Sequence, residues 1–162
     1  MDRSVESVKV ENWAAYSHPR WEEARRLIRQ IHPSPRVLQN YEPSEYFATV
    51  ALNNEKPIGY HIFRVQPIGP EFSMLPLLAP AGDPLKEARG RDFWLDPEWR
   101  GIGIGTKMQL VTVQTATDLG CYQLRSRSSL DRKANYAIKL KLGFTCLPVV
   151  RGNEDGTQDR GF

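Results

Sequence analysis

The chain has 162 residues, a length typical of one domain with a sizeable hydrophobic core. Its formal net charge is +3 with basic and acidic residues interspersed, so the charge permits an anionic ligand but does not indicate a nucleic-acid-binding protein. No apolar run approaches the roughly 18 residues of a membrane span, and no apolar segment follows Met1, which predicts a cytoplasmic protein that does not bind membranes.

The first half of the chain predicts a strand, a helix and a hairpin, in that order. Residues 5–13 partly alternate between apolar and polar side chains, as a half-buried strand does. A helix is expected from Ser17 onward, with apolar residues at helical spacing, and it ends at the proline-containing segment His32–Pro35. After an ambiguous stretch, residues 46–52 and 57–65 indicate two strands joined by a polar turn, which predicts an antiparallel hairpin.

A long irregular insert is expected over residues 67–90. This window contains five prolines and three glycines, a density that opposes a regular helix or strand. Its apolar residues, among them Met74, Leu75 and Leu78, argue against a simple linker, so we expect the insert to pack on another surface. Loops of this length are more often functional or disordered than incidental.

The second half of the chain alternates strands with helices. The expected elements are a strand at 91–96, a helix at 104–118, a strand at 122–127, a helix at 132–142 and a strand at 144–150. A strand–helix–strand crossover predicts a parallel pair, so the chain is expected to form a mixed α/β sheet with helices on both faces. The polar tail at 151–162 is expected to be a solvated loop or a frayed end.

Two cysteines, Cys121 and Cys146, form no CxxC pair, so a zinc or iron–sulfur framework is unsupported and no metal site is expected. Each cysteine has apolar neighbours in the sequence, which favours a buried free thiol over a reactive one.

Three glycines, Gly101, Gly103 and Gly105, join one of these strands to the helix that follows it. Backbone N–H groups at such a junction can bind an anion at the positive end of a helix, and glycine permits close approach. The dinucleotide pattern GxGxxG does not fit, because Thr106 and Met108 occupy the positions of its third glycine. The triphosphatase pattern GxxxxGK[ST] does not fit either, because no glycine–lysine pair occurs there.

The segment Arg100–Gly105 does fit a third pattern, (Arg/Gln)-x-x-Gly-x-(Gly/Ala). It resembles the acetyl-coenzyme A pyrophosphate loop of the GNAT N-acetyltransferase superfamily. The lead-in Leu95–Gly101 resembles that family's V-x-P-x-aromatic-R-G segment, and Asn135–Phe144 resembles its late helix, which commonly closes in K-L-G-F. These matches cover residues 91–147, and upstream of them only the order of elements is similar.

The resemblance implies a mixed, mostly antiparallel sheet, with a central parallel strand pair splayed around the cofactor and helices on both faces. It also implies acetyl-CoA as co-substrate, its pyrophosphate on the N–H groups of residues 101–106 and its pantetheine arm beside residues 93–95. The cofactor-binding residues that it assigns are Phe93, Trp94, Leu95, Arg100, Gly101, Ile102, Gly103, Ile104, Gly105, Thr106 and Asn135. Arg100 could instead pair with Glu98, and Asn135 could instead cap the late helix.

Proton transfer is where the chain departs from the family pattern. Family members often use a glutamate base on the strand before the loop, where this chain offers Asp92, with His61 on the neighbouring strand as the alternative. The position of the usual general-acid tyrosine is Lys139, which leaves Tyr136, one helical turn earlier, or water to protonate the leaving thiolate. Asp92, His61 and Tyr136 could each have a structural role instead.

The sequence therefore indicates one GNAT-like acetyltransferase domain over residues 1–162, in which a primary amine attacks acetyl-CoA directly. The acceptor is expected to be a small molecule or a protein. Two alternatives stay open: a non-catalytic module that binds acyl-CoA or a protein, and acetylation of aminoacyl-tRNA, the one nucleic acid considered compatible with the mild basicity. Assembly into a homodimer is also compatible with the sequence.

Overall fold

The computed structural model describes residues 4–32, 36–38, 41–70, 74–128, 132–146, 149–152 and 158–161. The chain forms two compact units, Met1–Arg125 and Ser126–Phe162, and the fold of each is described in turn. None of the helices in the described ranges is both long and apolar enough to cross a membrane. That the chain acts as a single domain stays a prediction.

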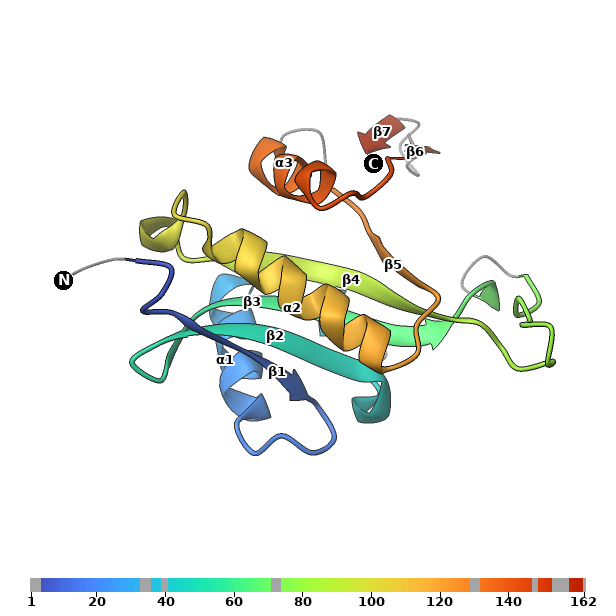
Figure 1. The fold of residues 1–162 in the computed structure, drawn as a ribbon, viewed down its shortest axis with the longest axis horizontal. Coiled ribbons are helices and arrows are strands. Elements are labelled where there is room, and N and C mark those ends of the chain that lie inside the picture. Colours follow the sequence, from blue (N-terminus) through green and yellow to red (C-terminus); the bar gives the residue numbers. More distant parts are fainter. Residues whose placement is uncertain are drawn as a thin grey trace. The chain divides into compact units, whose positions relative to one another are not determined.

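A five-stranded sheet is the centre of the first unit (Figure 1). Its strands lie in chain order: β1 (Lys9–Ala14), β2 (Tyr46–Asn53), β3 (Lys56–Pro67), β4 (Lys86–Leu95) and β5 (Gln123–Ser126). The first three neighbouring pairs are antiparallel, and β4 and β5 are parallel. The predicted mixed sheet with one parallel pair is thus confirmed.

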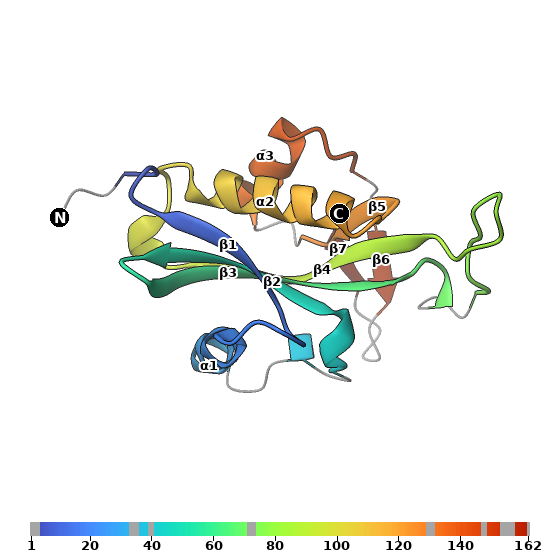
Figure 2. The ribbon, with the colours of Figure 1, turned by 60° about the horizontal axis from the view of Figure 1, so that its bottom comes forward.

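One helix covers each face of this sheet, as predicted (Figure 2). Helix α1 (Trp21–Ile31) packs through Trp21, Ala24 and Ile28 against alternate residues of β2 and β3. Helix α2 (Ile104–Asp118) covers the opposite face, where Ile104 and Met108 contact a cluster of buried apolar residues. Side chains of a strand alternate between its faces, so the centre of the sheet is buried on both sides. Short 3-10 turns lie at Arg36–Leu38, Pro43–Glu45 and Pro97–Trp99.

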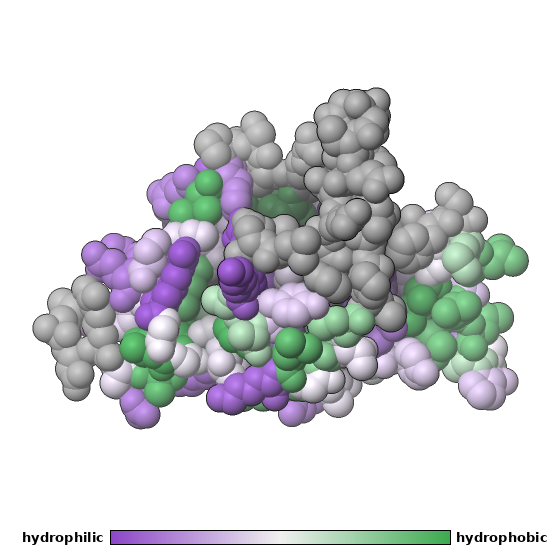
Figure 3. Space-filling model, turned by 90° about the horizontal axis from the view of Figure 1, so that it is seen from above, coloured by the Kyte–Doolittle hydropathy of each residue, from purple (hydrophilic) through white to green (hydrophobic). Residues whose placement is uncertain are grey.

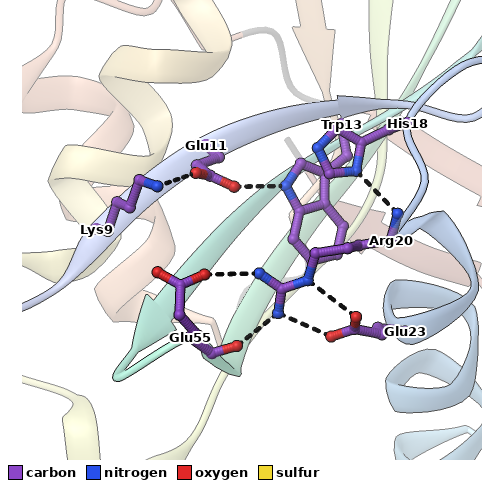
Figure 4. Close-up of polar contacts among 7 residues, drawn as sticks. All are labelled: Lys9, Glu11, Trp13, His18, Arg20, Glu23 and Glu55. Carbon is purple, nitrogen blue, oxygen red and sulfur yellow. Dashed lines mark hydrogen bonds and ion pairs between the residues drawn. The ribbon is translucent and has the colours of Figure 1, made fainter.

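Arg20 anchors the beginning of α1 to the turn between β2 and β3 (Figure 4). Its guanidinium donates to Glu23 from Nε at 2.9 Å and Nη2 at 2.8 Å, and to Glu55 from Nη1 at 2.9 Å. It also lies over the ring of Trp13, 5.0 Å from the centroid. Single exposed ion pairs contribute little to stability, but these contacts together orient the start of the helix.

The region between β3 and β4 differs from the predicted insert in two ways. First, β4 begins at Lys86, and its polar first residues pair with β3, where Gln66 lies opposite Glu87 and donates to it at 2.9 Å. The irregular part is therefore shorter than residues 67–90. A strand built from cross-strand polar pairs has no apolar alternation, so the sequence pattern did not reveal it.

Second, four apolar side chains in the described part of this insert are exposed and not packed. Backbone hydrogen bonds hold it together, including Ile68 N–H to Leu85 O at 2.9 Å and Leu85 N–H to Leu77 O at 2.7 Å. Its exposed side chains are Met74, Leu75, Leu77 and Leu78. They form an apolar patch at the right-hand end of Figure 3.

The second unit contains helix α3 (Lys133–Lys141) and a two-stranded antiparallel sheet of β6 (Val149–Gly152) and β7 (Gln158–Gly161). The expected strand at 144–150 is thus displaced toward the C-terminus. The polar tail contains a paired strand, where the sequence predicted a solvated loop or frayed end. Backbone hydrogen bonds make this hairpin, and they need no apolar alternation in the sequence. Residues 147–148, 153–157 and 162 lie outside the described part.

Candidate functional site

The segment that connects β4 to α2 begins with a turn that a side-chain hydrogen bond stabilises. Asp96 Oδ1 accepts a hydrogen bond from Glu98 N–H at 2.9 Å, which stabilises the 3-10 turn Pro97–Trp99. Arg100 Nε donates to the carbonyl of Leu95 at 2.8 Å. Arg100 thereby ties the loop back to the end of β4, an arrangement that differs from the Glu98 pairing left open by the sequence.

Two glycines of the loop adopt a backbone conformation that other residues avoid. The φ angles of Gly101 and Gly103 are 84° and 98°, in the left-handed region. A Cβ built on Gly101 would have no atom within 4 Å, and one on Gly103 would meet only Val5 Cγ2 at 3.9 Å. Glycine is required here by the rotation of the backbone, because the described atoms leave room for a Cβ at both positions.

The N-terminus of α2 is fixed in place, and its first N–H groups have no described backbone acceptor. Lys107 Nζ donates to Val8 O at 2.6 Å, and Ile104 is 1% exposed. The first backbone bond of the helix runs from Lys107 N–H to Gly103 O at 3.1 Å. The N–H groups of residues 101–106 donate to no carbonyl of the described backbone. Together with the helix dipole they form a place where an anion can bind.

The outer edge of β4 is open beside this loop. On its inner edge, Phe93, Trp94 and Leu95 pair with β3. On the outer edge, β5 has only four residues and begins opposite Lys86, whose carbonyl accepts from Tyr122 N–H at 2.8 Å. Four residues of strand span about 13 Å, too little to reach residues 93–95. No other described strand lies beside that end of β4.

A β-bulge determines which way Asp92 points. Phe63 pairs with Gly90 and Ile62 pairs with Asp92, so Arg91 is an extra residue in β4. The bulge reverses the alternation of side chains, and Asp92 lies on the same face as Ile62, toward α1. Without the extra residue, Asp92 would point toward α2.

Two side chains hold the Asp92 carboxylate at one oxygen. The hydroxyl of Tyr60 donates to Oδ2 at 2.7 Å, and His32 Nε2 lies 3.0 Å from the same atom. Burial, followed by the hydrogen bond to Asp92, raises the pKa of Tyr60, which keeps it a protonated donor. Among the described residues, no group contacts Oδ1. The Asp92 side chain is 25% exposed.

The sequence did not identify Tyr60 and His32 as partners of Asp92. Tyr60 appeared only as one residue of a predicted strand, and His32 only as part of a helix-ending segment. Their contact depends on strand register and on where α1 ends, and neither is a local property of the sequence.

The structure does not bring His61 together with Asp92. His61 lies on the opposite face, 1% exposed, with Nδ1 3.0 Å from Thr112 Oγ1. Thr112 Oγ1 is also 2.8 Å from Thr49 Oγ1, so these side chains link β2 and β3 to α2. This arrangement favours the structural role that the sequence left open for His61.

Asn135 and Tyr136 lie in α3, within the second unit. Asn135 is inside the helix, whose N-cap is Arg132, and its Nδ2 donates to Ser128 Oγ at 3.0 Å. The helix-cap alternative for Asn135 is therefore wrong. A hydrogen bond to Cys146 raises the pKa of Tyr136 to about 12. The roles expected of Asn135 and Tyr136 toward acetyl-CoA stay predictions.

Lys139, at the position of the family's usual tyrosine, is buried in the second unit. Its Nζ donates to Ser126 Oγ and Ser128 Oγ, each at 2.7 Å. Burial lowers its pKa to about 8. Within the described residues, the two hydroxyls satisfy this buried amine without a carboxylate.

Metal-binding groups and reactive thiols are not evident in the described residues. No cluster of three or more His, Cys, Asp or Glu side chains there could hold a metal ion. Cys121 and Cys146 are free and half-buried, and burial raises the pKa of Cys121.

Comparison with known proteins places this geometry in context. Residues 8–144 match the model of the acetyltransferase (GNAT) family. An aminoglycoside acetyltransferase from an uncultured soil metagenomic sample, solved with sisomicin, is 18% identical with a TM-score of 0.64, and the match covers 90% of this chain and 93% of that one. The aminoglycoside N-acetyltransferase AAC(6')-Iy, solved with CoA, is 15% identical with a TM-score of 0.63, covering 90% and 98%.

A Trypanosoma brucei acetyltransferase is 15% identical with a TM-score of 0.60, covering 86% of this chain and 93% of that one. At these identities the three likenesses show a shared fold. No curated protein matches the sequence significantly.

Proposed function

Because the chain belongs to the GNAT acetyltransferase family, we propose that it transfers an acetyl group from acetyl-CoA to a primary amine of a small molecule. The observation that supports this most directly is the loop at 101–106, which has two left-handed glycines and N–H groups that donate to no described backbone carbonyl. Such a loop suits a pyrophosphate at the N-terminus of a helix.

Residues of the first unit provide the contacts that acetyl-CoA needs. The N–H groups of residues 101–106 bind the pyrophosphate, and Arg100 keeps the loop against the end of β4. The backbone of residues 93–95 offers hydrogen-bonding groups at the open edge of β4, in the manner of a further strand, to the pantetheine arm. A backbone N–H there stabilises the negative charge that develops on the carbonyl oxygen. Acetyl-CoA supplies an activated thioester.

Asp92 accepts the proton of the acceptor. A primary amine such as a lysine side chain has a pKa near 10.4 and is largely protonated at neutral pH. Asp92 Oδ1 takes this proton while Tyr60 and His32 keep Oδ2 in place. The freed amine then has the electron pair with which it attacks. Tyr136 or water returns a proton to the thiolate.

The acceptor class is supported by fold alone. Two of the similar structures are aminoglycoside acetyltransferases, one solved with sisomicin, which carries several amines. A small-molecule amine is therefore the first acceptor to test. An amine of a protein, aminoacyl-tRNA and the non-catalytic module remain as alternatives from the sequence.

The cofactor site is tested with a matched pair of glycine variants. Gly101 and Gly82 both have positive φ, 84° and 91°, and a Cβ on either would meet no atom within 4 Å. Gly101→Val and Gly82→Val should each lower the free energy of unfolding by about 1–2 kcal/mol. Only Gly101→Val should weaken acetyl-CoA binding, measured as the thermal shift produced by the ligand. Equal thermal shifts in both variants would contradict the assigned site.

Turnover distinguishes an enzyme from a binding module. Release of free thiol is measured with acetyl-CoA and a panel of primary amines that includes sisomicin, a lysine peptide and aminoacyl-tRNA. We expect release above hydrolysis with small amines. Stabilisation by acetyl-CoA without release from any acceptor would instead support the non-catalytic module.

A further inference from the structure

His32 occupies a place that the end of α1 determines. Its backbone N–H donates to Ile28 O at 2.8 Å, and its backbone is extended, so the chain leaves the helix at this residue. At the other end of α1, Arg20 ties the helix to Glu55 in the turn between β2 and β3. The imidazole is therefore carried by a helix whose beginning is tied to the turn between β2 and β3.

The imidazole and Tyr60 share one oxygen of Asp92. His32 Nε2 is 3.0 Å and the Tyr60 hydroxyl 2.7 Å from Oδ2. A carboxylate held by two donors at one oxygen cannot rotate freely about its last bond. The other oxygen, Oδ1, consequently keeps a constant direction.

The two partners of Asp92 differ in how they respond to pH. Tyr60 is fully buried, and burial and its bond to Asp92 raise its pKa, so it stays a neutral donor. The His32 side chain is 42% exposed. Histidine is the side chain whose charge ordinarily changes between pH 5 and 8. Arg29 is the basic residue in the last turn of α1.

We propose that His32 is a positioning residue for Asp92 and makes acetyl transfer slower at acidic pH. Neutral His32 donates from Nε2 and directs Oδ1 at the acceptor, whose ammonium proton moves to Oδ1 while the amine keeps the electron pair. Protonated His32 places a cation against the same carboxylate and makes it a weaker base. The inference rests on the proposed function, because it assigns Asp92 as the base.

Two substitutions separate the positioning role from the charge. In His32→Gln a neutral amide can still donate to Oδ2, whereas His32→Leu has no donor. His18→Gln is the matched control, since His18 lies beside Trp13, away from Asp92. The rate kcat is measured from pH 5.5 to pH 8.5 with acetyl-CoA and the small amine that gave the highest turnover in the panel. Dividing the wild-type rate by each variant's rate cancels the ionisation of the amine.

We expect the kcat of the wild type divided by that of His32→Gln to be near one at pH 8.5 and to fall several-fold toward pH 5.5. His32→Leu should lower kcat about tenfold at pH 8.5, with the KM for acetyl-CoA unchanged and the His18→Gln ratio flat. A constant ratio for His32→Gln, or wild-type kcat in His32→Leu, would overturn the inference. Wild-type turnover tests the proposed function separately from these ratios.

Discussion

Strand β4 presents two carboxylates on one face of the sheet, Glu87 and Asp92, and they differ in how fully they are hydrogen-bonded. Glu87 is 1% exposed and accepts from Gln66, Gln123 and twice from Arg125, at 2.7 to 2.9 Å. Asp92 is partly exposed and is held at one oxygen only.

The difference sets a carboxylate with a structural role, Glu87, apart from the carboxylate that we propose as the base, Asp92. Burial opposes ionisation of Glu87, but the hydrogen bonds from Arg125, Gln123 and Gln66 outweigh it and lower its pKa. Both oxygens of Glu87 are occupied, so it can join β3, β4 and β5 but cannot take a proton from a ligand. The Asp92 side chain is partly exposed and has an oxygen with no described hydrogen-bond partner, which suits the general base that we propose.

The largest effect should come from removing the charge of Glu87. Glu87→Gln weakens four hydrogen bonds at a buried position and leaves the partly exposed guanidinium of Arg125 without its carboxylate, so we expect a loss of about 3 kcal/mol in the free energy of unfolding. Urea denaturation measures it. Glu22→Gln is the control, because Glu22 pairs with Arg25 but is 62% exposed and should change stability by less than about 0.5 kcal/mol. Similar effects of both changes would contradict the structural role of Glu87.

Asp92→Asn should show the opposite pattern. It should lower kcat about 100-fold and change the free energy of unfolding by less than about 1 kcal/mol. Thiol release and urea denaturation measure the two quantities. Asp118→Asn is the control and should leave both quantities unchanged. Asp118 lies at the end of α2 and accepts an exposed hydrogen bond from Gln114. Full activity of Asp92→Asn would remove Asp92 from the mechanism.

A pair of buried tyrosines tests the support of Asp92. Tyr60 and Tyr46 are both fully buried, but Tyr60 donates to Asp92 whereas the hydroxyl of Tyr46 has no hydrogen-bond partner. Tyr60→Phe should cost about 1.5 kcal/mol of stability and about tenfold in kcat. Tyr46→Phe should be neutral or slightly stabilising, since it removes an unpaired polar group. Equal losses in both variants would indicate a packing effect.

The smallest effect concerns the pH dependence of stability. The pKa of Glu87 is lower in the folded than in the unfolded state, so its contribution is present above the unfolded value and is lost as the pH falls through the folded value. Between about pH 5 and about pH 3 the wild type should therefore lose on the order of 1 kcal/mol more than Glu87→Gln. Urea denaturation across this range measures the difference. Parallel pH profiles would mean that Glu87 titrates alike in both states.

Some features of the site follow from short stretches of sequence. The glycines at 101, 103 and 105, the strand before them and the helix after them were all predicted, and Gly101 and Gly103 do adopt positive φ. The parallel pair β4–β5 followed from the same strand–helix–strand order. A positive φ angle requires glycine, and strands and helices have characteristic spacings of apolar residues. Both signals lie within a single segment, so they can be recognised without the rest of the chain.

Other features required the folded chain. Asp92 was predicted as the base, but the face on which it lies depends on the extra residue Arg91 in the pairing of β4 with β3. The contacts of Tyr60 and His32 with Asp92 join residues that lie far apart in the sequence. The apolar insert was expected to be packed and is exposed, because apolar composition does not say what surface is available to cover it.

The sequence by itself determined the family, the glycine loop and the order of strands and helices, since each depends on residues close together in the chain. Only the tertiary structure decided which carboxylate of β4 is saturated with donors and which keeps an oxygen available for a proton. That distinction depends on strand register, on one bulge and on the end of α1. Long-range pairing sets all three, and no local sequence pattern records it.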